Sequence, residues 1–237
     1  MSGLKPFWRY FGGKWRAAPH YPKPRYDTII EPFAGAAGYA LRYPERQVIL
    51  VERYHVVAEI WRWLIAATPD DVMAVPLVES TDDLPSDTPD GARWLVGFCL
   101  NSATTSPCRT LSAGRRKRQA MGRGYDGWGE NWRARVASQV NAIKHWKVIE
   151  GDYWEAPDVE GTWFVDPPYV RMGKHYRHGS KDIDYDNVAA WCRWWRGQVI
   201  VCEAADATWL PFQPWRLIKD MHGAHAEGLW TNDAIRP

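Results

Sequence analysis

The feature that most constrains the fold is a repeated alternation of short apolar runs with segments of helical periodicity. The first run opens DTIIEPFAGAAGYALRY (27–43), which turns through two glycines and continues with helix-compatible residues to Pro44. QVILVE (47–52) is a second apolar run with the length of a buried strand. VVAEIWRWLIAA (56–67) then repeats its apolar residues at helical spacing. This β-α-β-α opening predicts an α/β fold with a parallel sheet and crossover helices.

The rest of the chain continues this alternation after an interruption. ESTDDLPSDTPDG (79–91) is rich in acids, Ser and Pro and is expected to be a loop. Residues 104–130 have no apolar period and are expected to form an exposed, mobile arm. Helices are expected at 92–101, 131–146 and 187–196, the last of which ends at Gly197. Strand runs are expected at 147–154, 162–169 and 198–203, with a closing strand pair at 215–221 and 227–232.

The length of 237 residues suits one α/β domain, or a core domain that carries a small insertion. The four cysteines form no CxxC pair and have no histidine partners at zinc-finger spacing, which argues against structural zinc and against a disulfide framework. The N-terminus lacks the apolar segment of a signal peptide, and no apolar run is long enough to span a bilayer. We therefore expect a cytoplasmic protein with no membrane partner.

Positive charge is concentrated in one part of the chain. The net charge is +2, but the window 109–135 holds eight Arg or Lys against two acids, so it carries +6 and the remainder carries −4. Within this window, GRRKRQAMGRG (114–124) is a cation run between glycines, of the kind that neutralises phosphates without reading bases. The candidate phosphate-binding residues are Arg115, Arg116, Lys117, Arg118 and Arg123. A solvated charged surface is the competing interpretation.

Two glycine-containing segments near the N-terminus suit a nucleoside cofactor. In EPFAGAAG (31–38), a glycine turn between a strand and a helix leaves backbone N–H groups open to a ligand. Glu52 ends the next strand, 17 residues after Gly35, where its carboxylate could accept hydrogen bonds from both hydroxyls of a ribose. YFGGK (10–14) could present backbone N–H groups and the Lys14 ammonium to a carboxylate. Each motif alone is also compatible with an ordinary solvated turn.

The most informative motif is Asp166-Pro167-Pro168-Tyr169, which ends an apolar strand with an acid, two prolines and an aromatic ring. The prolines remove two backbone donors and fix two φ angles, so the motif is rigid. The Asp166 carboxylate and the Pro167 carbonyl could then accept both N–H bonds of an exocyclic amino group. Tyr169 offers a flat face on which a base taken out of its stack can rest. The motif therefore indicates a planar substrate that bears an amine, although these four residues alone are also compatible with a Pro-Pro turn capped by Asp.

In this order along the chain, YFGGK, the glycine turn, the strand-end acid and DPPY resemble the motifs of the DNA adenine-N6 methyltransferase family. The similarity is to the Dam-like class, and within it to the solitary methyltransferases of phages and prophages. It covers nearly the whole chain and is weakest from about 70 to 146. It implies a Rossmann-like methyltransferase fold with a mixed, mostly parallel sheet. Residues 1–69 and 147–237 would form the catalytic domain, and 70–146 a small, mainly helical insertion that recognises DNA.

The resemblance also implies roles for individual residues. S-adenosylmethionine is the implied cofactor. Tyr10 and Lys14 would bind its methionine end, and Glu31, Phe33 and Gly35 would form the strand-turn motif beneath it. Glu52 would bind the ribose, and Asp152 would accept from the adenine amino group. The implied catalytic residues are Asp166, Pro167 and Tyr169, with Asp166 also close to the cofactor. His175 and Tyr176 are expected either in a loop that closes over a flipped base of double-stranded DNA or in an ordinary exposed loop. No metal is required. The family's usual second glycine is Ala37 here, whose methyl group bears on how closely the backbone can approach the cofactor.

Other functions are compatible with parts of this pattern. The two acceptors do not distinguish adenine N6 from cytosine N4, or DNA from RNA. A nucleic-acid-binding module with a degenerate cofactor site would explain the cation run and Ala37. A dinucleotide oxidoreductase would leave both DPPY and YFGGK unexplained. The motifs do not encode the recognition sequence, the oligomeric state or a restriction partner.

Overall fold

A seven-stranded sheet forms the centre of the protein in the computed structural model, which describes residues 3–102, 104–122, 127–220 and 223–233. Its strands are β1 (Thr28–Glu31), β2 (Gln47–Glu52), β3 (Lys147–Glu150), β4 (Gly161–Val165), β5 (Gly197–Ala204), β6 (Gln213–Asp220) and β7 (Gly223–Thr231). Each strand run expected from the sequence is present, including the closing pair, but β3 ends at Glu150 and β4 at Val165, four residues before the expected ends at 154 and 169. The residues of β1, β4 and β5 are almost all buried, as in central strands that are covered on both faces.

The strand order is β3-β2-β1-β4-β5-β7-β6. The first five strands in this order pair in parallel, and Ile30 at the centre lies between Ile49 and Trp163. β7 is antiparallel to β5 and forms a hairpin with β6 at the edge of the sheet. The fold is therefore α/β with a mixed, mostly parallel sheet, as predicted.

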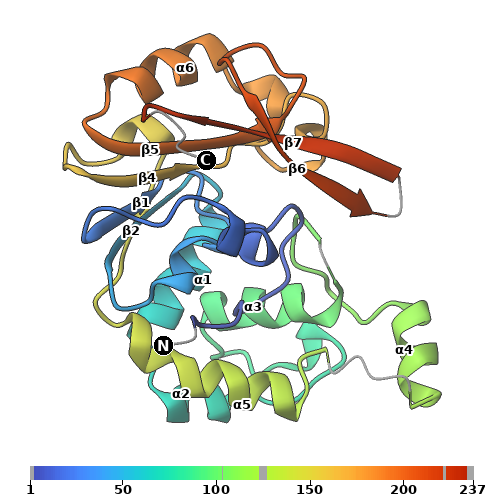
Figure 1. Ribbon diagram of the computed structural model, residues 1–237. Coiled ribbons are helices and arrows are strands. Elements are labelled where there is room, and N and C mark those ends of the chain that lie inside the picture. Colours follow the sequence, from blue (N-terminus) through green and yellow to red (C-terminus); the bar gives the residue numbers. More distant parts are fainter. Residues whose placement is uncertain (1–2, 103, 123–126, 221–222, 234–237) are drawn as a thin grey trace.

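Helices cover both faces of the sheet (Figure 1). They are α1 (His55–Ala66), α2 (Pro69–Ala74), α3 (Asp90–Leu100), α4 (Ala113–Ala120), α5 (Glu130–Gln139) and α6 (Tyr185–Trp194). Figure 1 shows α6 on one side of the sheet and α1, α3 and α5 on the other. The Asp184 carboxylate caps α6 by accepting from Asn187 N at 3.0 Å, so this helix begins two residues earlier than predicted. It also ends two residues earlier, at Trp194. None of the helices in the described ranges combines the length and the apolar composition needed to span a membrane.

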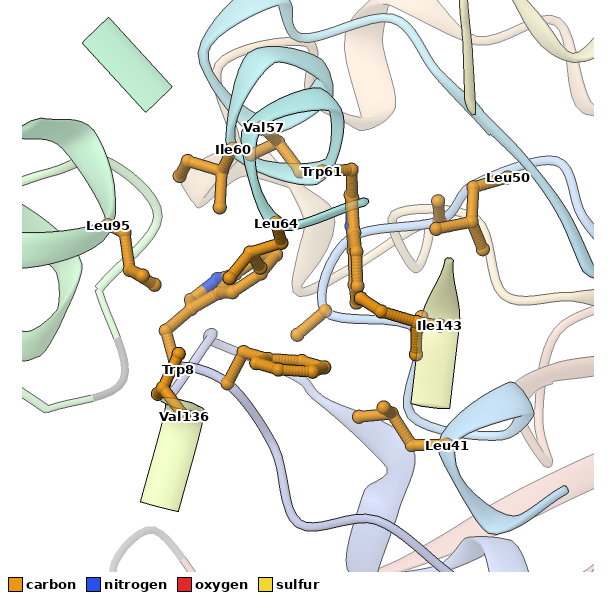
Figure 2. Packing of buried hydrophobic residues seen from close by; sticks show 14 of the residues in the cluster. Trp8, Leu41, Leu50, Val57, Ile60, Trp61, Leu64, Leu95, Val136 and Ile143 are labelled. Atoms are coloured by element: carbon orange, nitrogen blue, oxygen red, sulfur yellow. The ribbon is translucent and has the colours of Figure 1, made fainter. Parts of the chain in front are cut away.

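One hydrophobic core joins α1 to the long connection between α1 and β3. Figure 2 shows side chains of α1 near Trp8 of the N-terminal segment, Leu95 of α3 and Val136 of α5. The rings of Trp8 and Trp61 lie 5.1 Å apart, and both side chains are fully buried. Residues 70–146 thus build part of the same core as α1, and their role in recognising DNA stays a prediction.

The segment after the glycine turn is a single 3₁₀ turn, Ala40–Arg42, and not the helix predicted up to Pro44. Tyr43 precedes the proline, which disfavours the helical conformation at Tyr43. The Ala40 N–H donates to the buried Glu31 carboxylate at 2.6 Å instead of entering a helical ladder. Tertiary hydrogen bonding overrides the local helical preference here.

The basic segment contains a helix where none was predicted. α4 has no buried residue, so it has no apolar stripe that periodicity could detect. Its Ala, Arg, Lys and Gln residues nevertheless have high helix propensity. Figure 1 shows α4 at the periphery of the molecule. Residues 112–122 are mostly exposed, as predicted, whereas Leu111 and Trp128 of the predicted arm are buried. The prediction of an arm without a helix is wrong.

α2 is a second helix that was not predicted, and one predicted helix is divided in the structure. Thr68 begins α2 through a capping box: its hydroxyl accepts from Asp71 N at 3.1 Å, and the Asp71 carboxylate accepts from Thr68 N at 2.7 Å. The capping box and Pro69 in the first turn can be recognised in the sequence as TPDD. Apolar periodicity alone does not reveal them. The helix predicted over 131–146 is α5 followed by a 3₁₀ turn, Val140–Ile143.

Candidate functional site

A cavity of about 290 Å³ opens at the carboxyl ends of the parallel strands. Its wall includes residues that directly follow β1, β2, β3 and β4, together with parts of segments 10–14 and 176–187. This edge of a parallel α/β sheet is where ligands usually bind. The wall contains all eight predicted cofactor residues: Tyr10, Lys14, Glu31, Phe33, Gly35, Glu52, Asp152 and Asp166.

Glu52 closes the glycine turn that follows β1. One of its carboxylate oxygens accepts from Gly35 N and the other from Tyr54 N, both at 2.8 Å. Gly35 has a φ of +45°, and a side chain at this position would also meet the ring of Tyr10. Burial raises the pKa of Glu52, although the backbone N–H groups lower it. Each carboxylate oxygen keeps a lone pair, so Glu52 can hold the turn and accept from a ligand hydroxyl at the same time.

The YFGGK segment packs directly on the glycine turn. A Cβ at Gly38 would lie 2.6 Å from Trp15 N and 2.9 Å from Lys14 N, so only glycine allows this approach. Ala37 takes the left-handed conformation, with a φ of +49°, and is fully buried. Ala37 does not belong to the cavity wall, so its methyl group does not obstruct the cavity.

Lys14 and Asp166 form an ion pair in the cavity wall, with Nζ 2.6 Å from Oδ1. Lys14 Nζ also donates to Gly12 O at 3.2 Å and lies 4.6 Å from the centre of the Tyr169 ring. Burial raises the pKa of Asp166 to about 6, although Lys14 lowers it. Burial has the largest single effect on Lys14 and lowers its pKa, but the charges of Asp166, Glu227 and other acidic groups nearby together outweigh burial and raise the pKa above the usual lysine value. The cation and the predicted catalytic acid thus neutralise each other.

Glu31 is a second buried acid that interacts with this pair. Its Oε1 accepts from Ala40 N at 2.6 Å, and only 2% of the residue is exposed. Burial raises the pKa of Glu31 to about 8; the Ala40 N–H lowers it, and the charge of Asp166 raises it further. Burial thus favours the neutral form of Glu31, whereas Asp166 pairs with the Lys14 ammonium.

Another part of the wall carries aromatic rings and a second ion pair. Phe33 and Tyr153 stack with ring centroids 5.4 Å apart and planes at 25°. Asp152 accepts from Tyr153 N at 2.8 Å and pairs with Arg53 at 3.2 Å. Tyr153 and Arg53 line the cavity but were not predicted. Their positions in the sequence could have identified them, because each directly follows a predicted site residue near the end of a strand.

The DPPY motif is held by a hydrogen bond as well as by its prolines. The carbonyl of Pro168 accepts from the hydroxyl of Tyr185 in α6. Asp166 and Pro168 line the cavity, whereas Pro167 is buried and lies outside its wall. The role assigned to the Pro167 carbonyl stays a prediction.

Glu203 fixes the chain just after this motif. It is fully buried near the end of β5, and one carboxylate oxygen accepts from Val170 N at 3.1 Å and from the Trp209 indole at 3.2 Å. The other oxygen accepts from Ala204 N at 2.8 Å. Burial raises the pKa of Glu203, although these donors lower it. The sequence carries no signal for this role, because an acid at a strand end has the same pattern whether it is buried or solvated.

Tyr169 does not belong to the cavity wall. The Lys14 ammonium lies over its ring, and its hydroxyl donates to Glu227 at 3.0 Å. The flat face predicted to receive a base therefore carries Lys14 in this structure. Glu227 is a further residue that sequence reasoning did not find.

Tyr176 and His175 cover the YFGGK turn. The Tyr176 hydroxyl donates to Phe11 O at 3.0 Å, and Tyr176 lines the cavity. The ring of His175 meets the ring of Phe11 edge to face, with centroids 5.9 Å apart. Gly12 has a φ of +69°, and a Cβ there would lie 2.2 Å from the Tyr176 hydroxyl. Contact of these two residues with DNA stays a prediction.

The candidate phosphate-binding residues of α4 do not line the cavity. Arg115 contacts the hydroxyl of Ser102, and Arg116 pairs with Glu79 at 3.4 Å. Lys117 and Arg118 are exposed to solvent, whereas Arg123 lies outside the described residues. Consecutive residues of a helix point about 100° apart, so residues 115–118 cannot all face one DNA strand.

No family model and no curated protein matches this chain. Among solved structures, the chain is similar to one described as a conserved hypothetical protein from Streptococcus pyogenes, with 11% sequence identity and a TM-score of 0.40. The match covers 94% of this chain and 95% of that one.

Proposed function

We propose that the protein is a DNA adenine-N6 methyltransferase that uses S-adenosylmethionine. The observation that carries the proposal is the shared cavity, to which YFGGK, the glycine turn with Glu52, the strand-end Asp152 and Asp166 of DPPY all contribute. These segments lie far apart in the sequence. The resemblance assigns all of them to one reaction, and a common cavity is what that reaction requires.

The donors, acceptors and rings of the wall suit S-adenosylmethionine. Lys14 can pair with a carboxylate, and Glu52 can accept from ribose hydroxyls. The stacked rings of Phe33 and Tyr153 provide an apolar face for a purine, and Asp152 keeps acceptor capacity for an amino group. When bound, the cofactor supplies an electrophilic methyl group on a positively charged sulfur.

Asp166 is the residue proposed to orient the target amine. Its ionised carboxylate accepts one N–H of the amino group, and the Pro167 carbonyl accepts the other. Accepting both bonds raises the electron density on the nitrogen and turns its lone pair toward the methyl group. Alignment of the reacting atoms lowers the entropic part of the barrier, and the fixed acceptors stabilise the charge that develops on the nitrogen. The N6 proton is then lost to water.

The direct test is to incubate the protein with double-stranded DNA and with S-adenosylmethionine that carries an isotope-labelled methyl group. The DNA is then digested to nucleosides, and labelled N6-methyladenine is expected by mass spectrometry. Asp166→Ala protein, purified in the same way, controls for a methyltransferase from the expression host. Label in N4-methylcytosine, or in RNA alone, would assign a different base. Calorimetric binding of the cofactor with no label in any nucleic acid would favour the inactive binding module.

Removal of the positive charge from α4 is expected to reduce the salt dependence of DNA binding. Each lost phosphate contact flattens the slope of log affinity against log salt by about 0.9. Replacing residues 115–118 by Ala should remove at most ~4 contacts, and nearer ~2 because Arg115 and Arg116 have partners within the protein. α4 buries no side chain, so the fold should be unaffected. Fluorescence anisotropy at increasing salt measures the slope.

The matched comparison uses two double variants. Lys117→Ala/Arg118→Ala and Arg193→Ala/Arg196→Ala remove the same charge, but the second pair lies in and just after α6, on the other side of the sheet. Only the first should flatten the slope. Single-molecule sequencing of methylated random DNA should show a nearly unchanged sequence preference. A preference that changes with α4 would mean that this helix reads bases.

A further inference from the structure

Glu227 of β7 is a buried acid to which neither the sequence motifs nor the resemblance points. Only 1% of the residue is exposed. Its Oε1 accepts from the Tyr21 hydroxyl at 2.7 Å and from the Tyr169 hydroxyl at 3.0 Å. Its Oε2 is buried without a hydrogen-bond partner in the described part of the chain. Burying an unpaired carboxylate oxygen lowers stability, so the position of this residue calls for an explanation.

The two tyrosines reach Glu227 from distant parts of the chain. Tyr21 belongs to the N-terminal segment and packs against Phe164 of β4, with ring centroids 5.2 Å apart. Phe164 in turn stacks on Tyr39 at 4.4 Å, with parallel planes. Tyr169 is the last residue of DPPY. Glu227 therefore connects the ring of Tyr169 to a rigid part of the core.

Other groups hold the backbone at Tyr169. Its carbonyl accepts from Gly173 N at 2.6 Å, and the N–H of the next residue, Val170, donates to Glu203 at 3.1 Å. Glu227 reaches Tyr169 through the hydroxyl, at the end of the ring farthest from the backbone. A restraint at this end limits rotation and tilt of the ring and leaves the backbone as it is.

The restrained ring has one face beside the Lys14–Asp166 pair, because Lys14 Nζ lies 4.6 Å from the ring centre and 2.6 Å from Asp166. A base that stacks on this face would take the place of the Lys14 ammonium and bring its amino group next to the Asp166 carboxylate. Resting on the function proposed above, we propose that Glu227 is a positioning residue, which holds the Tyr169 hydroxyl so that this ring face forms the platform for the flipped base.

A double-mutant cycle between Glu227 and Tyr169 tests this role. Tyr169→Phe and Glu227→Ala should each lower kcat/KM for DNA about tenfold, as expected when a hydrogen bond to a charged group is lost. The double variant should be no worse than the worse single variant, since both changes remove the same contact. Losses that multiply to about 100-fold in the double variant would overturn the proposal.

Two further variants separate positioning from a general loss of structure. Glu227→Gln keeps an acceptor oxygen in the same place and should retain activity within about threefold. Tyr169→Ala removes the platform itself and should lose roughly 10–100-fold in kcat/KM, more than Tyr169→Phe. The KM for S-adenosylmethionine should stay within about twofold in the Glu227 variants, because none of them changes the cavity wall. A Glu227→Gln protein as damaged as Glu227→Ala would contradict the proposed contact.

A second measurement does not depend on methyl transfer. Labelling with 3-fluorotyrosine gives each tyrosine a ¹⁹F NMR signal, and the Tyr169 signal is assigned by its absence in Tyr169→Phe. This signal should be single and narrow in the wild type and in Glu227→Gln, and split or broadened in Glu227→Ala. Tyr21→Phe removes the other donor to Glu227 and should leave the signal narrow. If Glu227→Ala does not fold, Glu227→Met replaces it.

An unchanged Tyr169 signal without the Glu227 carboxylate would overturn the positioning role. This result is separable from a failure of the proposed function. If the wild-type protein methylated no DNA but its Tyr169 ring were ordered only in the presence of Glu227, the proposed reaction would be disproved. The proposed contact between Glu227 and Tyr169 would still be supported.

Discussion

Asp166→Ala is expected to abolish methyl transfer to DNA while leaving the affinity for S-adenosylmethionine within a few-fold. Asp166 is assigned to the target amine, whereas Glu52 and Asp152 are assigned to the cofactor. Loss of a preorganised polar group of this kind lowers kcat by about 10²–10³-fold. The ion pair is one reason to expect a nearly unchanged affinity for the cofactor. When Asp166 is absent, Lys14 can bind the cofactor carboxylate without first breaking its contact with Asp166.

Single-turnover methylation and titration calorimetry measure these two quantities separately. Asp158→Ala removes the same charge from the exposed loop before β4 and is the matched control. Asp166→Asn keeps the shape and one acceptor oxygen but places an NH₂ group beside an ammonium or an amine, so it should be almost as inactive. Turnover of Asp166→Ala within tenfold of the wild type would rule out the assigned role.

The second large effect is expected from Lys14→Met, and its first part concerns the cofactor. Lys14 supplies the cation for the cofactor carboxylate, and a charge-assisted contact of this kind contributes about 1.5–3 kcal/mol. The affinity for S-adenosylmethionine should therefore fall about 10–100-fold. Lys5→Met is the matched control, because the Lys5 ammonium lies over the Trp15 ring and outside the cavity wall. Equal cofactor affinity in Lys14→Met and the wild type would remove Lys14 from the site.

The other part of the Lys14→Met effect concerns pH. Burial raises the pKa of Asp166 to about 6, and Lys14 keeps it from rising further. The ionised carboxylate is the stronger acceptor for the amine and carries no O–H that would compete, so kcat/KM for DNA in the wild type should fall as the pH falls through about 6. Without the ammonium, this acid limb should move to higher pH. Lys14→Arg keeps the charge and should keep the limb close to its wild-type position.

The pH profile is that of kcat/KM for DNA, measured with the cofactor saturating, so that the weaker cofactor binding of Lys14→Met does not enter. If activity fell at the same pH in Lys14→Met as in the wild type, a group other than Asp166 would be responsible for the fall. Glu31 is the nearest alternative, with a pKa of about 8, and Glu31→Gln would identify it.

Much of the cavity can be predicted because its residues follow strands. Glu52, Asp152 and Asp166 each stand at or just after the carboxyl end of a parallel strand, and these ends meet at one edge of the sheet. The apolar runs that mark the strands are long enough to recognise, so the acids after them can be placed together. The eight predicted cofactor residues accordingly share one cavity, although no distance between them can be read from the sequence.

The rest depends on contacts that no local pattern encodes. α4 forms without an apolar stripe, and Ala40–Arg42 stays a short turn because a buried carboxylate takes the Ala40 N–H. Glu227 reaches DPPY from the far end of the chain, and its neighbours in β7 look like those of any strand. The direction of a side chain at a strand end follows from tertiary packing. The pairing of Lys14 with Asp166 is of this kind.

That pairing has a thermodynamic consequence for the proposed reaction. Each member already meets a group that resembles its expected ligand: Asp166 meets an ammonium in place of an amine, and Lys14 meets a carboxylate in place of the cofactor's. Binding of one ligand alone would leave one buried charge unpaired, which costs several kcal/mol, whereas binding of both would leave none. Cofactor and DNA should therefore bind with positive cooperativity, each raising the affinity of the other by the same factor. DNA affinities with and without a non-reactive cofactor analogue would give that factor, and equal affinities would mean that the two sites are independent.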